Sequence, residues 1–152
     1  MISEKGVKLI KSFEGLAPLE YTCVAGKRTI GYGHVLEPEE KYPCGVCERK
    51  AEELLKQDLD IAEKAVEKLV DVPLSEYQKD ALVSFVFNVG IRAFEKSTLL
   101  KELNEYRYDR VPRQLQRWIY VNGRPCGGLI RRRKAEAALF TKSAGRKRPV
   151  FL

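Results

Sequence analysis

Three side chains that can carry out acid–base or nucleophilic chemistry lie within the first thirty residues of the chain. Glu14 supplies a carboxyl group, Cys23 a thiol and Thr29 a hydroxyl. Eight residues separate Glu14 from Cys23, and five more separate Cys23 from Thr29. The segment that joins them is rich in turn-forming residues and can fold back on itself. We therefore expect the three side chains to line one cleft, as the groups of an active site do.

Further motifs follow along the chain. They are Gly31-Tyr32-Gly33-His34, Gln57-Asp58, the run from Ser84 to Gly90, and Arg117-Trp118. Together with the Glu-x8-Cys-x5-Thr spacing, they resemble the phage-type lysozymes, the endolysins of glycoside hydrolase family twenty-four, over nearly the whole chain. The resemblance implies an α+β, lysozyme-like fold. It would have a small N-terminal lobe with short β-hairpin strands, a long connecting helix and a helical C-terminal lobe.

The resemblance also implies a function, namely muramidase activity that lyses the host cell. The bond to be hydrolysed is the β-1,4 bond between N-acetylmuramic acid and N-acetylglucosamine in peptidoglycan. Such hydrolysis needs an acid for the leaving oxygen and a second group that attacks or holds a water. We expect Glu14 to be the acid, at a helix end where packing by Phe13 and Leu16 removes water and favours the neutral carboxyl group.

The role of Cys23 is open, because this position is an aspartate in many relatives. Its thiol is mostly neutral near neutral pH unless the site favours the thiolate. It could accept a proton from the attacking water, stabilise positive charge as a thiolate, or act as a covalent nucleophile. The hydroxyl of Thr29 would position the water, although its β-branched side chain is also simply typical of a strand.

For other positions, the resemblance implies substrate contacts and one ion pair. Val35, Phe87 and Ser97 would bind substrate, although Phe87 is equally well explained as a core residue. His34 would form a structural ion pair with Asp58, which predicts a raised pKa for the imidazole. His34 is the only histidine, so a metal site built mainly from imidazoles is excluded, and we expect no metal and no cofactor.

The remaining cysteines allow a redox hypothesis. Cys44 and Cys47 have the spacing of half a zinc site or of a redox motif, but no second paired motif follows. With Cys23 and Cys126 they could form disulfides in an oxidising compartment. Some relatives are held inactive by a disulfide to the catalytic thiol, so Cys44 or Cys47 could block Cys23 in this way, although free thiols are the simpler expectation.

Composition is typical of one globular domain with a basic surface. The chain has 152 residues, 44% hydrophobic and 32% charged, with a net charge of +7 and a pI near 9.3. The charge favours anionic polymers such as the bacterial wall. We interpret the basic runs at 131–134 and 146–148 as a solvated helix face and a loose tail. No nucleic acid is expected as a partner, and a monomer is the default.

The apolar runs are too short for a membrane span, and the first residues lack the apolar core of a secretory signal. Some relatives carry an N-terminal signal-anchor. We therefore expect either an endolysin that stays in the host cytoplasm until a holin or equivalent pore releases it to the periplasmic cell wall, or one from which such an anchor has been removed.

We expect a single lysozyme domain over 1–152. Its parts are a lobe at about 15–50, a connecting helix at about 48–70, a helical lobe at about 74–142 and a basic tail at 143–152. Capping signals predict a first helix from Ser3 to Gly15, and a core helix from Ser75 to Gly90. In the connecting helix, apolar residues from Ala51 to Leu69, Ile61 included, recur at helical spacing. Further helices are predicted at 97–103, 109–119 and 129–140, with turns at 122–123 and 127–128.

Three other activities compete with hydrolysis of the glycan. A lytic transglycosylase uses one acid and no hydrolytic water, which Thr29 at the family spacing argues against. A thiol hydrolase would pair Cys23 with His34. A non-catalytic wall-binding or membrane-disrupting protein would rely on the basic, partly amphipathic segment 129–140.

Overall fold

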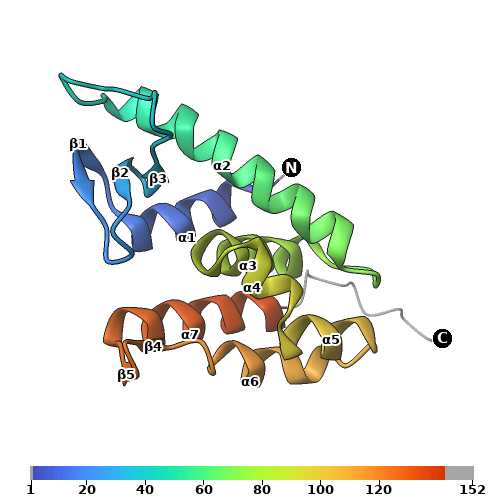
Figure 1. Ribbon diagram of the computed structural model, residues 1–152. Helices are drawn as coiled ribbons and strands as arrows, with labels where there is room; N and C mark the ends of the chain where they lie inside the picture. The colour runs from blue at the N-terminus through green and yellow to red at the C-terminus, as the bar shows by residue number, and fades with distance from the viewer. Residues whose placement is uncertain (1, 143–152) are drawn as a thin grey trace.

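A long helix runs alongside both a small β-sheet and a group of packed helices (Figure 1). The computed structural model describes residues 2–142, so the predicted basic tail lies outside the described residues. The elements in chain order are α1 (Glu4–Glu14), β1 (Ala17–Thr22), β2 (Arg28–Gly31), β3 (His34–Val35), α2 (Glu48–Leu69), α3 (Glu76–Val89), α4 (Ile91–Glu95), α5 (Thr98–Asn104), the 3-10 helix η1 (Tyr108–Arg110), α6 (Val111–Leu115), β4 (Tyr120–Val121), β5 (Arg124–Pro125) and α7 (Gly127–Thr141). The predicted α+β class is confirmed.

Helix α1 begins and ends at the residues that its capping signals predict. The hydroxyl of Ser3 accepts a hydrogen bond from the Gly6 N–H, and it donates one to the buried carboxylate of Asp80 in α3. At the other end Gly15 has φ 67° and donates its N–H to the Lys11 carbonyl; its ψ of 155° lies outside the left-handed helical region that we expected. The chain therefore turns sharply after Glu14, the last residue of α1.

The β1–β2 hairpin holds the second and third members of the predicted trio, Cys23 directly after β1 and Thr29 within β2. The sheet has the order β1-β2-β3 and is antiparallel, with Tyr21 opposite Thr29. A tight turn joins β1 to β2, in which the Gly26 N–H donates to the Cys23 carbonyl at 2.8 Å and the Cys23 N–H donates to the Lys27 carbonyl at 2.9 Å. Cys23 is therefore fixed through its backbone, directly beyond the end of β1.

Helix α2 contacts both β2 and α3, so it connects the sheet to the helical part of the chain (Figure 1). Its apolar residues from Ala51 to Val66 are buried on one face. Ile61 is an exception to the expected pattern, because its side chain is 58% exposed. The helix stops at Leu69, four residues before Pro73.

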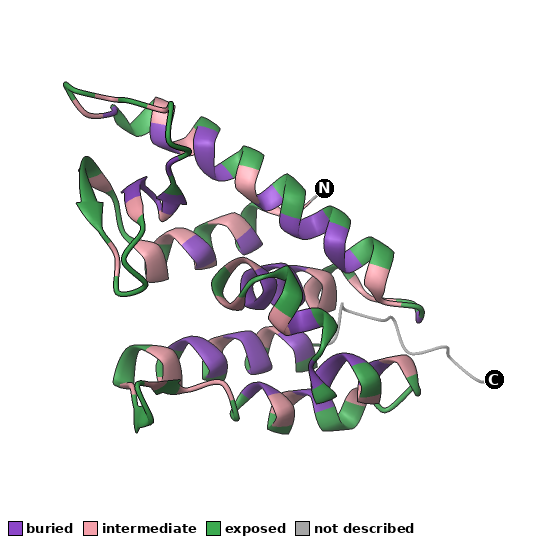
Figure 2. Ribbon diagram, viewed as in Figure 1, coloured by how far each residue is buried: buried purple, intermediate pink, exposed green. Residues whose placement is uncertain are grey.

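Helix α3 forms the centre of the helical part, where buried residues concentrate (Figure 2). Ser75 and Gln78 form the predicted capping box, since each side chain binds the other residue's backbone N–H. The ring of Phe85 is fully buried and packs edge-on against Trp118, with 5.5 Å between centroids. Helix α3 also packs against α1, α2 and α7, so it supports every helix that contributes to the site below.

The C-terminal segments differ from prediction in three places. The helix predicted over 109–119 is divided into η1 and α6, and it ends at Leu115, after which the chain places Trp118 against the core. The short helix α4 was not predicted. Residues 122–123 form the expected turn, within a hairpin of β4 and β5, but the two glycines at 127–128 are the first turn of α7 and not a loop.

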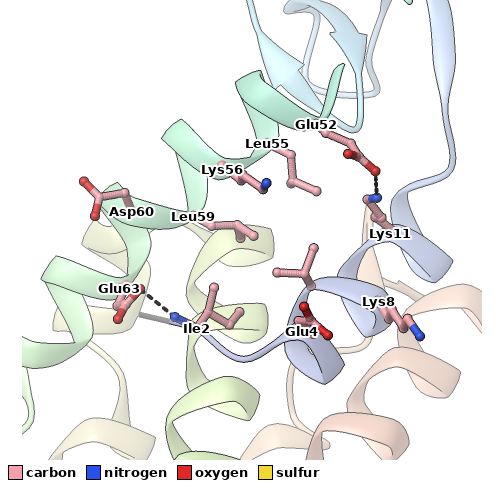
Figure 3. A pocket seen from close by; sticks show the side chains of 11 residues that line it. Ile2, Glu4, Lys8, Lys11, Glu52, Leu55, Lys56, Leu59, Asp60 and Glu63 are labelled. Atoms are coloured by element: carbon pink, nitrogen blue, oxygen red, sulfur yellow. Dashed lines mark hydrogen bonds and ion pairs between the residues drawn. The ribbon is translucent and has the colours of Figure 1, made fainter. Parts of the chain in front are cut away.

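A groove between α1 and α2 is separate from the predicted trio (Figure 3). It is a cavity of about 600 Å³ with an apolar floor that includes Leu55 and Leu59. An ion pair between Lys11 and Glu52 closes one end. Within residues 2–142, no helix combines the length and apolar character that a membrane crossing requires.

Candidate active site

One cavity brings Glu14, Cys23 and Thr29 together, as their spacing predicts. It has a volume of about 590 Å³ and lies between the hairpin, the end of α1 and the C-terminal end of α3. Glu14 reaches it from α1, Cys23 from the hairpin turn and Thr29 from β2. The cavity therefore presents a carboxyl group, a thiol and a hydroxyl to one bound molecule.

The carboxylate of Glu14 has a charged partner that the sequence does not predict. Leu16 is 42% exposed, whereas Arg132 Nη1 of α7 donates to Glu14 Oε1 at 2.6 Å. On the other side, a Cβ atom at Gly33 would lie 2.9 Å from Oε2, and Gly33 has φ 76°. Gly33 thus permits both the turn after β2 and the close approach of the carboxylate, and either would be strained with another residue.

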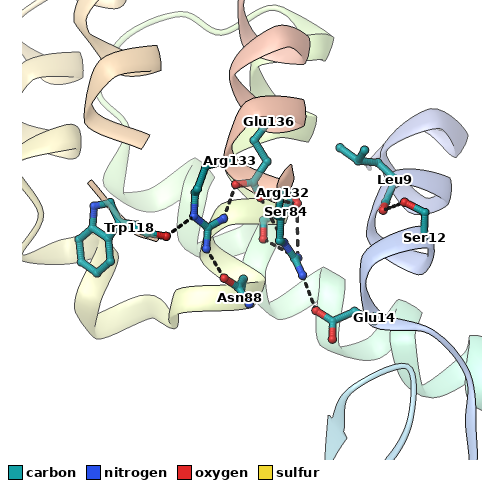
Figure 4. Close-up of polar contacts among 9 residues, drawn as sticks. All are labelled: Leu9, Ser12, Glu14, Ser84, Asn88, Trp118, Arg132, Arg133 and Glu136. Carbon is teal, nitrogen blue, oxygen red and sulfur yellow. Dashed lines mark hydrogen bonds and ion pairs between the residues drawn. The ribbon is translucent and has the colours of Figure 1, made fainter. Parts of the chain in front are cut away.

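Behind Glu14 lies a buried cluster of charges (Figure 4). Arg132 and Arg133 are only 4% and 1% exposed, so the prediction that this basic run is a solvated face is wrong for these two residues. Both arginines donate to Glu136, which is fully buried. Ser84 donates to the same carboxylate at 2.6 Å, and its carbonyl accepts from Arg132 Nη2 at 3.1 Å. Burial of two cations is possible here because each has an anionic partner.

The structure adds Arg132 to the site, a residue that the sequence reading missed. The signal that could have indicated its burial is Glu136, which follows Arg132 by four residues and Arg133 by three. At these spacings the three side chains share one face of a helix. A helix face on which the cations have an anionic partner can be buried in the protein, whereas a face that carries only cations cannot.

The environment of Cys23 favours its thiolate. The pKa of the thiol is lowered from its ordinary value by the backbone N–H of Lys27 and, next, by the Thr29 hydroxyl. That hydroxyl has one proton, and it can also donate to the Lys27 carbonyl, which lies 3.0 Å away. Cys23, Cys44, Cys47 and Cys126 are all free thiols.

We predict that iodoacetamide alkylates Cys23 with a pH midpoint below that of a free cysteine, because the thiolate is the reactive form. Replacing Thr29 with Val should move this midpoint upward, because the hydroxyl contact is lost. Peptide mapping by mass spectrometry would follow Cys23 separately from the other three thiols. A midpoint that is equal in both proteins would show that the hydroxyl does not act on Cys23.

His34 lies between two carboxylates behind the cavity. Its Nδ1 is 2.8 Å from Asp58 Oδ2, and its Nε2 is 3.0 Å from Glu40 Oε2. Burial lowers the pKa of His34, but the hydrogen bonds to Asp58 and Glu40 outweigh that effect, so the pKa is raised above 6.5. For Asp58, burial raises the pKa by more than the imidazole lowers it. Asp58 also lines the cavity of the trio, which brings this pair next to the site.

We therefore predict that His34 makes the stability of the folded protein depend on pH. Its folded-state pKa is higher than its unfolded value, so its contribution is fully present below about pH 6.5 and is lost as the pH rises through the folded-state pKa. The stability difference between wild type and His34→Gln in urea should therefore shrink between pH 5.5 and 8.5. A difference that grows with pH would contradict the raised pKa.

The residues expected to bind substrate do not lie together. Val35 and Phe87 line the same cavity as the trio. Ser97 is buried at the N-terminus of α5, where its hydroxyl donates to the Phe94 carbonyl and accepts from the Leu100 N–H. It lines a separate cavity of about 380 Å³, together with Trp118. Across residues 2–142, no group of three or more His, Cys, Asp or Glu side chains is arranged to hold a metal ion.

A second cavity adjoins Glu14 on its other side. Its volume is about 420 Å³, and α1 and the first turns of α7 line it, with Cys126 and Arg131 among the lining residues. Glu14 and Asn88 line both this cavity and that of the trio. Glu14 therefore lies in the wall between two hollows, where a polymer could extend on both sides of it.

Comparison with known proteins shows the family to which the chain belongs. Residues 11–136 match the phage lysozyme family. The chain is 42% identical over 145 residues to the endolysin of Acyrthosiphon pisum secondary endosymbiont phage 1, which covers 91% of this chain and 97% of that protein. It is also 42% identical over 142 residues to the endolysin of Bacillus phage B103, again over 91% of this chain, but it spans only 53% of that longer protein. Among solved structures, the muramidase domain of SpmX from Asticaccaulis excentricus superposes with a TM-score of 0.85 at 40% identity, over 94% of this chain and 99% of that one. The chain belongs to the phage lysozyme family.

Proposed function

We propose that the chain is an endolysin, a muramidase that hydrolyses the β-1,4 bond between N-acetylmuramic acid and N-acetylglucosamine in peptidoglycan. The observation that carries this proposal is one cavity that holds Glu14, Cys23 and Thr29, with Glu14 oriented by a buried arginine. The family and the names of the relatives support it. This chain spans 53% of the longer Bacillus phage relative, so the activity proposed is that of the matched domain.

In the proposed reaction, Glu14 protonates the glycosidic oxygen. Arg132 donates to Oε1, and an arginine can only donate, so the proton that is transferred is carried on Oε2. As the bond to that oxygen breaks, a water or the Cys23 thiolate attacks the anomeric carbon from the side of the hairpin; the glycosyl thioether that the thiolate would form is then hydrolysed by water. Cys23 then acts as base, as thiolate stabiliser or as nucleophile, and the Thr29 hydroxyl orients the water.

The place of action proposed is the periplasmic cell wall. The net charge of +7 favours association with anionic wall polymers. Before release the enzyme would stay in the host cytoplasm as a monomer, and a holin or equivalent pore would give it access to the wall.

Reducing ends released from purified peptidoglycan test this proposal. A muramidase creates one reducing end for each bond hydrolysed, whereas an enzyme that cuts the stem peptides releases amino groups instead. New reducing ends without new amino groups are expected. Amino groups alone would overturn the proposal.

A further inference from the structure

Asn88, like Glu14, lines both cavities of the candidate site. It lies near the C-terminal end of α3, is exposed, and among residues 2–142 is, apart from Glu14, the one residue that lines both cavities. If a glycan occupies both cavities, a group in that position faces the part of it that spans the reacting bond. Exposure and position alone do not give it a role, so the orientation of its side chain decides the argument.

A buried arginine fixes that orientation. Arg133 Nη2 donates to Asn88 Oδ1. Arg133 is itself held in place, because its Nε donates to the Trp118 carbonyl at 2.9 Å, its Nη1 pairs with Glu136, and its guanidinium lies 4.9 Å from the ring centre of Phe85. Since a guanidinium has no acceptor, the oxygen of the Asn88 amide must face it.

The NH2 group of the Asn88 amide is then left as a hydrogen-bond donor. Asn88 Nδ2 has no acceptor within the described part of the chain, and it belongs to a residue that lines both hollows. We propose that Asn88 is a substrate-binding residue whose Nδ2 donates a hydrogen bond to an acceptor oxygen of the glycan, beside the bond that Glu14 protonates. The inference rests on the proposed muramidase function.

The same buried carboxylate thus supports both groups of the cleft wall. Glu136 holds Arg132, which orients Glu14, and it holds Arg133, which orients Asn88. A proton donor and a hydrogen-bond donor are thereby positioned before substrate binds. Pre-orientation of this kind lowers the entropic cost of binding and of reaching the reactive geometry.

The test is Asn88→Asp, which keeps an acceptor for Arg133 and removes the donor. We expect kcat/KM for reducing-end release to fall about 10- to 100-fold, since an unpaired acceptor of the substrate then faces a carboxylate. The melting temperature should not fall, because the new carboxylate pairs with Arg133. Asn88→Ala removes the donor without adding a charge and should show a similar loss per folded molecule. Asn122→Asp makes the same change in the β4–β5 turn, outside both cavities, and should match wild type.

The outcomes separate this inference from the proposed function. If Asn88→Asp keeps wild-type kcat/KM while Glu14→Gln is inactive, the proposed function stands and Asn88 is merely a partner of Arg133. If Asn88→Ala loses activity but Asn88→Asp does not, Asn88 acts by accepting the hydrogen bond of Arg133 and not by donating one to the substrate. If wild type releases no reducing ends, the proposed function fails and this inference fails with it.

Discussion

Glu14→Gln is expected to lower the rate of lysis of outer-membrane-permeabilised bacteria about 100- to 10,000-fold, the range that a general acid contributes. The amide keeps the size of the side chain, and its oxygen can still accept from Arg132. What it loses is the transferable proton. Loss of turbidity over time, at equal protein concentration, would measure the effect.

The control for this variant is Glu4→Gln in the same helix. Glu4 lines the groove between α1 and α2 and not the cavities beside Glu14, so its replacement should leave lysis at the wild-type rate. Equal lysis by wild type and Glu14→Gln would contradict the enzymatic account. A cationic protein that binds the wall or disrupts the membrane would then explain killing better.

The largest effect on stability is expected from Glu136→Gln. This change removes one of two anions from a cluster in which Arg132 and Arg133 are buried. Removing one partner of a buried ion pair typically costs about 3–5 kcal/mol. For a chain of this size, the melting temperature should fall by roughly 10 °C. Thermal unfolding followed by circular dichroism would measure it.

A matched change at the surface should have little effect. Glu53 of α2 is exposed and, among residues 2–142, pairs only with the neighbouring Arg49 and Lys50, and exposed pairs contribute about 0–1 kcal/mol. Glu53→Gln should therefore unfold within about 4 °C of wild type. If Glu136→Gln were as stable as Glu53→Gln, the buried charges would not be coupled as the geometry indicates.

The features that the sequence predicted correctly are those with local signals. Ser3, and Ser75 with Gln78, mark helix starts because a capping side chain binds backbone within the same turn. The hairpin that carries Cys23 and Thr29 follows from β-branched residues between glycines. Each of these signals is complete within a few residues, so it needs no knowledge of the rest of the fold.

The features that the sequence reading missed depend on distant partners. Arg132 is buried because Glu14, 118 residues earlier in the chain, and Ser84 complete its hydrogen bonds. Nothing in the basic run itself distinguishes a buried arginine from a solvated one, as the exposed Arg131 beside it shows. Likewise, the helix predicted over 109–119 ends at Leu115, and Trp118 beyond it packs against Phe85. Tertiary packing overrides local propensity at such points.

The masses of the products from purified peptidoglycan test the central claim most directly. Hydrolysis adds one water to each bond broken, whereas a transglycosylase leaves an anhydro product that lacks it. The account predicts hydrated disaccharide-peptides with a reducing muramic acid from wild type, and none from Glu14→Gln. Anhydro products from wild type, or hydrated products from both proteins, would contradict it.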